Sequence, residues 1–482
     1  MSARAGALRG ALTQAAALRA AGRREEAIRL LERALAGVVG AGVVEAEARD
    51  LLGRLWLDEK QPAKAITELT RAAELAPGSF HHLAHLATAL TAAGRPSAAD
   101  RVLVHAMQLA PLEAGLPFNL GTQRLQRGDA AAAIPPLLQA LQLEPNHSQA
   151  ALNLGTALRE QGRLNEAEAI LRQILASPTV GVEARWNLAL ALLQQERWAE
   201  GWVCYEARRQ LRGFAMDRLP LPAWTGEPTG HLLVFAEQGL GDTLQFLRFL
   251  PQLKGRAGAL TLRVHDPLLP LLAATCAAWE ISLIGRSAPL PEVDAAVPLL
   301  SLAGMGDLAA VSSAPYLDAD PARRARVRAK LGRGAPRQIG LCWQGNRSYR
   351  LDRQRSLPPE VLAALLGPPL PGCRWTSLQQ GEPVLEGVEP WPGLDADGAF
   401  VDSAALLAEL DLLITSDTAM AHLAGALGTP VWLLLAHVPD WRWGLTGEQT
   451  VWYPGTRLFR QPRPGDWAAV VAEVRDRLSA LP

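Results

Sequence analysis

The sequence predicts two kinds of fold in one chain, an all-helical repeat array followed by two α/β domains that each contain a parallel sheet. Small-residue turns recur every 34 residues through the first half, a period typical of stacked helical hairpins. A connector rich in Pro and Gly follows at 213–230. Beyond it, short apolar runs alternate with helical patterns, which indicates parallel strands joined by helices. We therefore expect domains at 1–212, 213–335 and 336–482.

The bulk composition favours several globular domains. Of 482 residues, 49% are apolar and 20% are charged, a balance typical of folded rather than disordered chains. Lys plus Arg and Asp plus Glu both number 48, so the formal net charge is zero. Because proteins that bind nucleic acid usually carry a basic excess, we expect no nucleic-acid partner.

The cysteines and the apolar runs bear on location. Cys204, Cys276, Cys342 and Cys373 are widely spaced and form no metal-ligand pattern, so we expect reduced thiols and no bound metal. No apolar run reaches the roughly 18 residues that a membrane span needs. Arginines interrupt the N-terminus and leave no apolar segment of a secretory signal. A cytoplasmic location is therefore expected.

Three markers share the 34-residue period. They are turn glycines at Gly94, Gly128 and Gly162, extended in phase to Lys60 and Glu196; Asn-Leu-Gly at 119–121 and 153–155, with Asn-Leu-Ala at 187–189; and prolines at 77, 111, 145 and 178. Proline ends the second helix of each unit because it has no N–H. The small residues Ala65, Ala99, Ala133 and Ala167 let the two helices of each unit approach closely. Since one hairpin cannot bury its apolar stripe alone, neighbours must stack.

These markers resemble the tetratricopeptide repeat (TPR), over residues 1 to about 212 in about six units. The resemblance implies a concave groove for protein–protein interaction, with a protein or peptide as partner. His81, His82 and His85 cluster in one segment, and His81 and His85 share a helical face. No carboxylate or thiol accompanies them in that segment, so we expect surface or groove histidines rather than a metal site.

Apolar runs locate the strands and helices of the second half. We expect strands at 231–236, 260–264, 281–284, 339–343, 375–378, 410–415 and 431–435, and helices at 243–253, 321–338 and 418–427. Two such blocks indicate paired Rossmann-like domains with a cleft between them. Ligands of parallel sheets bind at the carboxyl ends of strands, where loops enter helix N-termini. Three segments have this context.

The first segment is a glycine turn that contains Gln238, Gly239, Gly241 and Asp242. A dinucleotide-binding GxGxxG motif would have its third glycine where Leu244 stands, which disfavours a nicotinamide or flavin cofactor. The turn instead presents Asp242 at the mouth of the cleft, where a carboxylate can serve as general base. Capping of the following helix is a second, compatible role for Asp242.

The second segment is a basic loop at 345–356, which follows a predicted strand and carries four arginines within nine residues. A solvated charged loop is the simpler explanation. Its position favours guanidinium groups that clamp a diphosphate by bidentate hydrogen bonds. The candidate donor-binding residues here are Asn346, Arg353, Arg355 and Ser356.

The third segment is the turn 416–422, where a predicted strand ends and a helix begins. Asp417 or Ser416 is the expected N-cap. Free backbone N–H groups and the helix dipole make such a turn an anion site. Thr418, Ala419 and His422 are therefore further candidates for contact with a phosphate or a sugar.

Together these segments resemble a known enzyme family. The motifs are AEQGLGD, GN-x5-DR-x-RS, SDTAMAHLAGALGTPVWLLL, PDWRW, WYPGTRLFRQ and PRPGDW, between about Trp202 and Trp467. They resemble TPR-linked bacterial glycosyltransferases related to the heptosyltransferase (ADP-heptose:LPS) family. The resemblance implies an inverting, metal-independent GT-B enzyme with no cofactor, an acceptor domain at 213–335 and a nucleotide-sugar domain at 336–482.

The resemblance also implies roles for individual residues. Asp242 would be the catalytic base. Arg353 and Arg355 would neutralise the leaving phosphate, and Asp417, Thr418 and His422 would surround the pyrophosphate. The basic loop departs from the family pattern at Arg347 and Tyr349, where relatives often carry proline and histidine, which favours an electrostatic over a catalytic role.

Other residues and functions stay open. Gln379 and Glu382 follow a predicted strand and are possible nucleotide contacts, whereas Trp441 and Trp443 either stack on a ligand or seat their loop. One hypothesis is a glycosyltransferase that moves a sugar from a nucleotide-diphosphate sugar to a protein or glycan acceptor held by the TPR groove. The alternative is a non-catalytic TPR adaptor with a degenerate transferase fold. Retention of Asp242, Arg355 and the 416–422 turn together favours the enzyme.

Overall fold

The computed structural model describes residues 2–36, 38, 42–211, 219–306, 315–332, 336–347, 352–368, 370–381 and 385–481. The chain divides into two compact units, Met1–Val180 and Gly181–Pro482. The described residues of the first unit form helices and turns only, and the second unit contains two parallel sheets with helices. The predicted order, a helical repeat array followed by an α/β region, is confirmed. No described helix is both long and apolar enough to cross a membrane.

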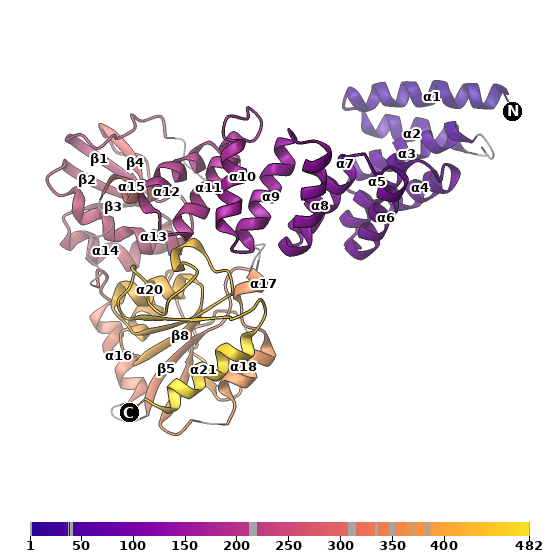
Figure 1. Cartoon of the computed structure of the whole chain (residues 1–482). Helices are drawn as coiled ribbons and strands as arrows, with labels where there is room; N and C mark the ends of the chain where they lie inside the picture. The colour runs from indigo at the N-terminus through magenta and orange to yellow at the C-terminus, as the bar shows by residue number, and fades with distance from the viewer. Residues whose placement is uncertain are drawn as a thin grey trace. The chain divides into compact units, whose positions relative to one another are not determined.

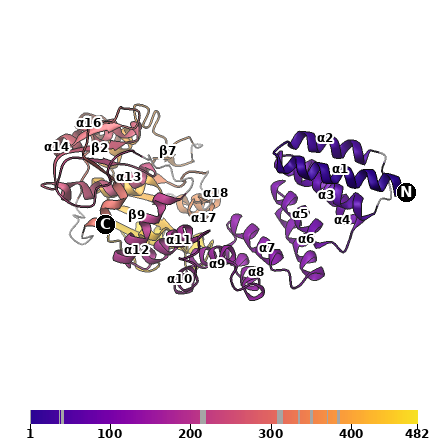
Figure 2. The ribbon, with the colours of Figure 1, turned by 90° about the horizontal axis from the view of Figure 1, so that it is seen from above.

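The helices of the first unit form successive hairpins, which Figure 2 shows for α1 to α6. They are α1 (Ser2–Ala20), α2 (Arg24–Leu35), α3 (Val43–Asp58), α4 (Pro62–Leu75), α5 (Phe80–Ala92), α6 (Pro96–Leu109), α7 (Gly115–Gln126), α8 (Ala130–Leu143), α9 (Ser148–Glu160) and α10 (Leu164–Gln173).

The 34-residue turn marker has a backbone cause. Gly94, Gly128 and Gly162 have φ angles of 69°, 82° and 71°, a left-handed conformation that glycine adopts without a Cβ clash. Lys60 and Glu196, reached by extending the period, have φ angles of 55° and 59°. The period therefore marks one left-handed turn residue between the two helices of each hairpin, whether or not that residue is glycine.

The glycine of the Asn-Leu-Gly marker has a different cause, the close approach of paired helices. A Cβ on Gly121 would lie 2.5 Å from Cγ of Leu137, and one on Gly155 would lie 2.7 Å from Cγ of Leu171. Both leucines are fully buried. The period therefore records a repeated contact in which a leucine of the second helix packs on a glycine of the first.

Two helices that continue the repeat pattern, α11 (Gly181–Gln194) and α12 (Trp198–Tyr205), belong to the second unit. The 3₁₀ helix η1 (Glu206–Gln210) follows them. The Trp202 ring packs edge-on against the Trp441 ring with centroids 5.3 Å apart. Gln194 Nε2 donates a 2.8 Å hydrogen bond to the Pro439 carbonyl. These contacts make the last hairpin part of the α/β unit.

The first sheet has four parallel strands in the order β3-β2-β1-β4. Its elements are β1 (Thr229–Phe235), α13 (Leu240–Phe246), η2 (Leu247–Leu253), β2 (Ala257–Val264), η3 (Asp266–Leu268), α14 (Leu269–Ala278), β3 (Ser282–Gly285), β4 (Ala295–Pro298), η4 (Leu299–Ser301) and α15 (Leu302–Met305). β1 is flanked by β2 and β4, so the loop after β1 leaves the carboxyl end of an interior strand rather than of an edge strand.

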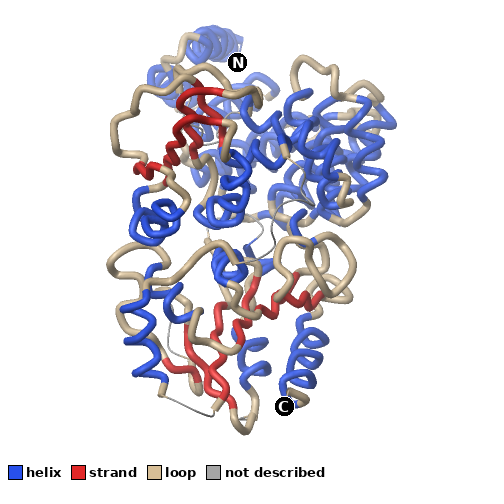
Figure 3. Tube along the Cα trace, turned by 90° about the vertical axis from the view of Figure 1, so that its left-hand side faces the viewer, coloured by secondary structure: helices blue, strands red, loops and turns tan. Residues whose placement is uncertain are grey.

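The second sheet has six parallel strands in the order β10-β9-β8-β5-β6-β7, visible as the lower group of red strands in Figure 3. Its elements are α16 (Pro321–Leu331), β5 (Arg337–Cys342), α17 (Asp352–Arg355), α18 (Pro359–Leu366), β6 (Cys373–Ser377), β7 (Val388–Glu389), α19 (Val401–Leu407), β8 (Leu412–Ser416), α20 (Ala419–Leu427), β9 (Val431–Leu435), η6 (Trp441–Trp443), β10 (Thr456–Arg460) and α21 (Trp467–Ser479).

The two faces of the six-stranded sheet bury different side chains. Ile414 and Leu434 face a cluster with α18 and α21, which lie together in Figure 1. Leu413 and Leu433 face the larger cluster with α16, α19 and α20. This alternation along each strand explains why the strands read as continuous apolar runs, as in sheets covered by helices on both faces.

Most predicted strands lie within two or three residues of the observed ones, but two helices were misjudged. The helix predicted at 321–338 ends at Leu331, and Arg337 already begins β5. The helix predicted at 243–253 is α-helical only to Phe246 and continues as the 3₁₀ helix η2, which contains Pro251. Strands β4, β7 and β10 were not predicted: β7 has two residues, β4 consists mostly of Ala and Pro, and two arginines interrupt the apolar residues of β10.

Gly121→Ala should destabilise the repeat array by about 1–3 kcal/mol, because the new methyl group overlaps Leu137 in a packed core. Urea unfolding of the full chain followed by circular dichroism measures this. Gly10→Ala in α1 is the matched control, since a Cβ there meets nothing within 4 Å and alanine favours a helix by about 0.5–1 kcal/mol over glycine. Equal stability of the two variants would contradict the close-packing explanation.

Candidate functional site

The glycine turn and the 416–422 turn meet in the second unit, because α13 packs against α20. A Cβ on Gly241 would lie 3.1 Å from Cα of Ala419 and 3.3 Å from Cδ2 of His422. Only glycine permits this approach without a shift of the α20 backbone. Two of the three segments that the sequence singled out are therefore in direct contact.

Asp242 lies in the first turn of α13 and has two kinds of partner. Its Oδ2 accepts a 2.9 Å hydrogen bond from the Gly239 N–H, which caps the helix start. Its Oδ1 pairs with the Arg442 guanidinium. The side chain is 22% exposed. Burial raises the pKa of the Asp242 carboxyl and Arg442 opposes that rise. The predicted capping role is thus present, and the carboxylate keeps an exposed edge.

Arg442 is the residue that the sequence analysis missed, although its motif PDWRW was recognised. It lies in η6, 200 residues from Asp242. Its Nη1 donates to Asp440 Oδ1 at 2.8 Å and its Nε donates to Gln245 Oε1 at 2.5 Å. Its guanidinium also lies over the Trp441 ring, 4.4 Å from the centroid. The Trp441 side chain is 5% exposed, which fits a residue that seats this loop.

The end of the basic loop, at Arg355 and Ser356, reaches the turn before α20. Arg355 Nη1 donates a 3.0 Å hydrogen bond to the Asp417 carbonyl, and its Nε donates to Asp352 Oδ1 at 3.1 Å. Ser356 Oγ donates to the other oxygen of the Asp352 carboxylate at 3.0 Å. All three predicted segments therefore converge, with Arg355 as the link between the second and the third.

The start of α20 differs from the prediction in one detail. The N-cap is Thr418, whose Oγ1 accepts a 3.3 Å hydrogen bond from the Met420 N–H. The expectation that Asp417 or Ser416 caps the helix is wrong. Because Thr418 takes the cap position, the Asp417 side chain is not needed for it, and Asp417 lies just before the helix.

Burial is the largest influence on the pKa values of Asp417 and His422. Burial and the charge of Asp440 raise the pKa of Asp417 to about 6, against the opposing effect of Arg355. Burial, with the positive charges of Arg442 and Arg248, holds the pKa of His422 well below its usual range. His422 is therefore neutral at neutral pH. Asp417, in contrast, gains and loses its proton near pH 6.

His422 is fixed by aromatic neighbours. Its ring stacks on Trp443 with centroids 5.5 Å apart and planes 16° from parallel. Its Nδ1 lies 3.0 Å from the Tyr453 hydroxyl. Tyr453 in turn fills the space beside Gly425 of α20, where a Cβ would overlap the tyrosine ring. Trp443 is therefore buried against His422, which fits the alternative that it seats its loop.

The other candidate residues from the sequence are not among the contacts that join the three segments. Gln379 Oε1 accepts hydrogen bonds from the backbone N–H groups of Trp343 and Gln344, at 3.1 and 2.9 Å, so its carbonyl oxygen holds the loop after β5. Asn346 and Arg353 are exposed. Glu382 lies outside the described residues. Among the described residues, no group of three or more His, Cys, Asp or Glu side chains is arranged to hold a metal ion.

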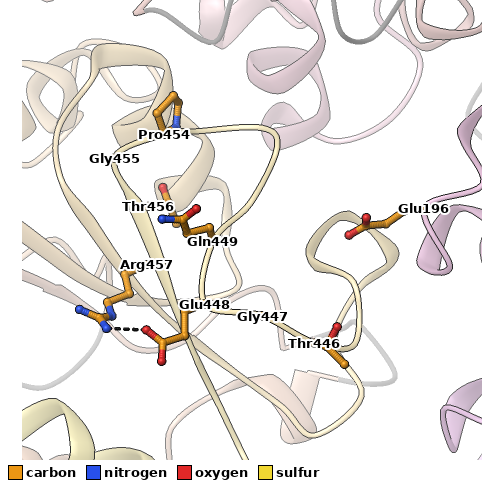
Figure 4. A pocket seen from close by; sticks show the side chains of 9 residues that line it. All are labelled: Glu196, Thr446, Gly447, Glu448, Gln449, Pro454, Gly455, Thr456 and Arg457. Carbon is orange, nitrogen blue, oxygen red and sulfur yellow. Dashed lines mark hydrogen bonds and ion pairs between the residues drawn. The ribbon is translucent and has the colours of Figure 1, made fainter.

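A cavity of about 640 Å³ lies in the loop region beyond η6 (Figure 4). It is lined by Glu196, Thr446, Gly447, Glu448, Gln449, Pro454, Gly455, Thr456 and Arg457. Its wall contains the Glu448–Arg457 ion pair. No candidate site residue from the sequence lines it. Arg460 donates to the carbonyls of Gly444 and Gly447 at 3.0 and 2.9 Å and so holds the loop between η6 and the cavity.

A buried ion-pair network supports the glycine turn from behind. Arg208 and Glu237 are both fully buried and lie 2.7 Å apart. Arg208 also donates to Ser301 Oγ at 2.8 Å. Gln238, the next residue, donates to the Tyr205 hydroxyl at 3.2 Å. Tyr205 is the last residue of α12, and Arg208 lies in η1 directly after it. The end of the last hairpin therefore holds the segment that leads to Asp242.

The histidine segment of the first unit also acquires a carboxylate that the sequence did not reveal. Asp50 Oδ1 of α3 lies 2.7 Å from His85 Nδ1 and 3.1 Å from His82 Nδ1, and Arg54 lies 3.0 Å from its other oxygen. Burial would raise the pKa of Asp50, but the hydrogen bonds of the two histidines hold it well below its usual range. His82 is buried, so the expectation of a surface or groove histidine is wrong for it.

Comparisons with known proteins agree with the repeats. Residues 12–80 and 124–179 match models of the tetratricopeptide repeat family. Protein FlbA of Caulobacter vibrioides is 31% identical over 318 residues, 58% of this chain and 52% of that protein. The chain thus spans about half the length of this curated relative.

Solved structures include the thermophilic TPR protein TTC0263 of Thermus thermophilus, 26% identical with a TM-score of 0.31, covering 39% of this chain and 100% of its own. Another is MamA of Desulfovibrio magneticus, 16% identical with a TM-score of 0.31, covering 34% of this chain and 92% of its own. The family matches and the 34-residue hairpins together show that the N-terminal part consists of tetratricopeptide repeats.

Glu237→Gln should lower the free energy of unfolding by about 1–3 kcal/mol, because it removes one partner of a fully buried ion pair and leaves Arg208 with the more exposed Glu206 as its remaining carboxylate. Denaturant unfolding of the full chain measures the change. Arg209→Gln is the control: Arg209 is 41% exposed and pairs with Glu206 on the surface, so its loss should cost less than about 1 kcal/mol. A Glu237→Gln variant as stable as the control would refute the network's structural role.

Proposed function

We propose that the chain is an inverting, metal-independent GT-B glycosyltransferase. It takes a sugar from a nucleotide-diphosphate sugar and transfers it to a protein or glycan acceptor that the repeats recruit. The observation that carries this proposal is the convergence of Asp242, Arg355 and the N-terminus of α20 at one place. A carboxylate, a guanidinium and a helix N-terminus are the groups that base-assisted transfer from a diphosphate needs.

The reaction follows from these groups. The Asp242 carboxylate takes the proton of an acceptor hydroxyl as the acceptor oxygen forms its bond to the anomeric carbon. The bond between that carbon and the diphosphate oxygen breaks, and its electron pair leaves with the diphosphate. The Arg355 guanidinium and the positive end of the α20 dipole stabilise the charge that develops there. Attack opposite to the leaving group inverts the anomeric centre.

The tetratricopeptide repeats support a role in protein interaction. Helices α11 and α12 extend the repeat pattern and also contact the segments that carry Asp242 and Arg442. The last hairpin therefore connects the repeats, along the chain, to the segments of the proposed site. This continuity favours a polypeptide acceptor over a free glycan.

One observation favours the alternative, a non-catalytic adaptor. Asp242 is already paired with Arg442, and a carboxylate in an ion pair is a weaker base than a free one. An adaptor would retain the ion pair as a structural contact. Donor binding and turnover separate the two functions.

The proposed donor site predicts that nucleoside diphosphates and nucleotide sugars raise the melting temperature of the full chain at millimolar concentration. Arg355→Gln should weaken binding of the stabilising nucleotide about tenfold or more, because a charge-assisted hydrogen bond contributes about 1.5–3 kcal/mol. Arg463→Gln is the control, since Arg463 is 83% exposed and lies in the loop before α21. Calorimetric titration gives both affinities. No stabilisation by any nucleotide would remove the basis of the donor site.

The proposed base predicts that Asp242→Asn lowers turnover about 10²–10⁴-fold, the usual contribution of a general base, while nucleotide binding is retained. Release of nucleoside diphosphate from the nucleotide sugar identified by melting measures turnover, with water as the minimal acceptor. The asparagine keeps the size of the side chain, so folding should be preserved. Unchanged turnover would exclude Asp242 from the mechanism.

A further inference from the structure

Arg442 stands between the proposed base and the proposed donor site, and each arm of its guanidinium has a separate partner. Nη1 is held by Asp440 at 2.8 Å and Nε by Gln245 at 2.5 Å, whereas Nη2 pairs with Asp242. The side chain is only 9% exposed. Two anchored arms hold the Nη2 nitrogen in place, so an incoming anion can replace Asp242 there without movement of the Arg442 side chain.

The Nη2 arm lies close to where a diphosphate would bind. Gly241, the neighbour of Asp242, touches Ala419 and His422 at the start of α20. The positive charge of Arg442 is felt at both Asp417 and His422, since it lowers the pKa of each. A diphosphate at the N-terminus of α20 would therefore compete with the Asp242 carboxylate for the same N–H donors. Arginine suits both anions, because its planar fork matches carboxylate and phosphate geometry.

We propose that Arg442 is a positioning residue that exchanges anions: without donor its Nη2 holds Asp242, and when a diphosphate binds it replaces Asp242 at Nη2 and so releases Asp242 to act as base. This inference rests on the proposed function. Its consequence is an order of events, because the base is freed only once the leaving group is in place.

Several charged or titratable groups face this contact from the packed elements. They are Asp242 of α13, Asp440 and Arg442 at η6, Asp417 and His422 at α20, Arg355 of α17, Arg248 of η2 and Tyr205 at the end of α12. A single pH profile would mix their titrations. Competition between two anions for one arginine is instead tested by thermodynamic linkage, with no need for turnover.

The experiment measures the affinity of the full chain for inorganic pyrophosphate by calorimetric titration in four proteins: wild type, Asp242→Asn, Arg442→Gln and the double variant. Asp242→Asn removes the competing anion, so pyrophosphate should bind about fivefold tighter or more, the lower end of typical coupling between two sites. Arg442→Gln should bind more weakly than wild type. In the Arg442→Gln background, Asp242→Asn should give no gain.

The double variant separates exchange from simple charge removal. Loss of a nearby negative charge would improve anion binding with or without Arg442, so a gain that survives in the Arg442→Gln background overturns the proposal. Unchanged affinity in Asp242→Asn also overturns it, while the donor site stands. Failure of wild type and Asp242→Asn to bind pyrophosphate would overturn both the exchange and the donor site.

Arg442 is buried, and its glutamine variant could fold poorly. Arg442→Lys keeps one positive charge and serves as the second background for the same cycle. A lysine ammonium cannot hold Asp440, Gln245 and a third anion in one plane, so the gain from Asp242→Asn should shrink there as well. A full gain in the lysine background would show that any cation suffices and would overturn the role of the guanidinium arm. Arg463→Gln, on the surface, should bind pyrophosphate like wild type.

Discussion

The close approach of α13 and α20 at Gly241 is the constraint on which the second unit depends. These helices follow β1 of the four-stranded sheet and β8 of the six-stranded sheet, so their contact joins the carboxyl ends of two strands from different sheets. Polar side chains that each sheet presents at that edge are then forced into one neighbourhood. A single added methyl group at Gly241 would press on the Ala419 backbone and displace α20 slightly, because a Cβ there lies 3.1 Å from Cα of Ala419.

A second consequence of this arrangement is the use of aromatic packing around the contact. Trp198 and Trp202 of α12 meet Trp441 and Trp452 of the loop region with ring centroids 5.3 to 6.4 Å apart. Such large rings bury much apolar area with few rotatable bonds. They fix the η6 loop, and with it Arg442, against a helix that began as part of the repeat pattern. The last hairpin, α11 and α12, thus follows the repeat pattern in sequence but packs as part of the α/β unit.

Features with local causes could be predicted from the sequence, whereas those set by tertiary contacts could not. The 34-residue period follows from one left-handed residue and one glycine–leucine contact per hairpin, as at Gly128 and Gly121, and both causes recur at a fixed spacing. Buried strands read as apolar runs, but the two residues of β7 are too few for any pattern, and two arginines interrupt the apolar residues of β10. Asp242 could be selected because it follows a strand, yet its partner Arg442 lies 200 residues away. Asp50 likewise joined the histidines from a neighbouring helix, outside the segment in which a carboxylate was sought.

The balance of charge at the site explains why one arginine would have to change partners. Asp242, Asp417 and Asp440 lie close to two guanidinium groups, those of Arg355 and Arg442. The raised pKa of Asp417, about 6, is the physical sign that burial and the charge of Asp440 outweigh the nearby positive charge. A diphosphate adds further negative charge, so it can bind there only where cationic N–H groups are turned toward it and away from a carboxylate. Arg355 donates one arm to a backbone carbonyl and another to a carboxylate, whereas the Arg442–Asp242 pair is the contact whose exchange would serve both binding and catalysis.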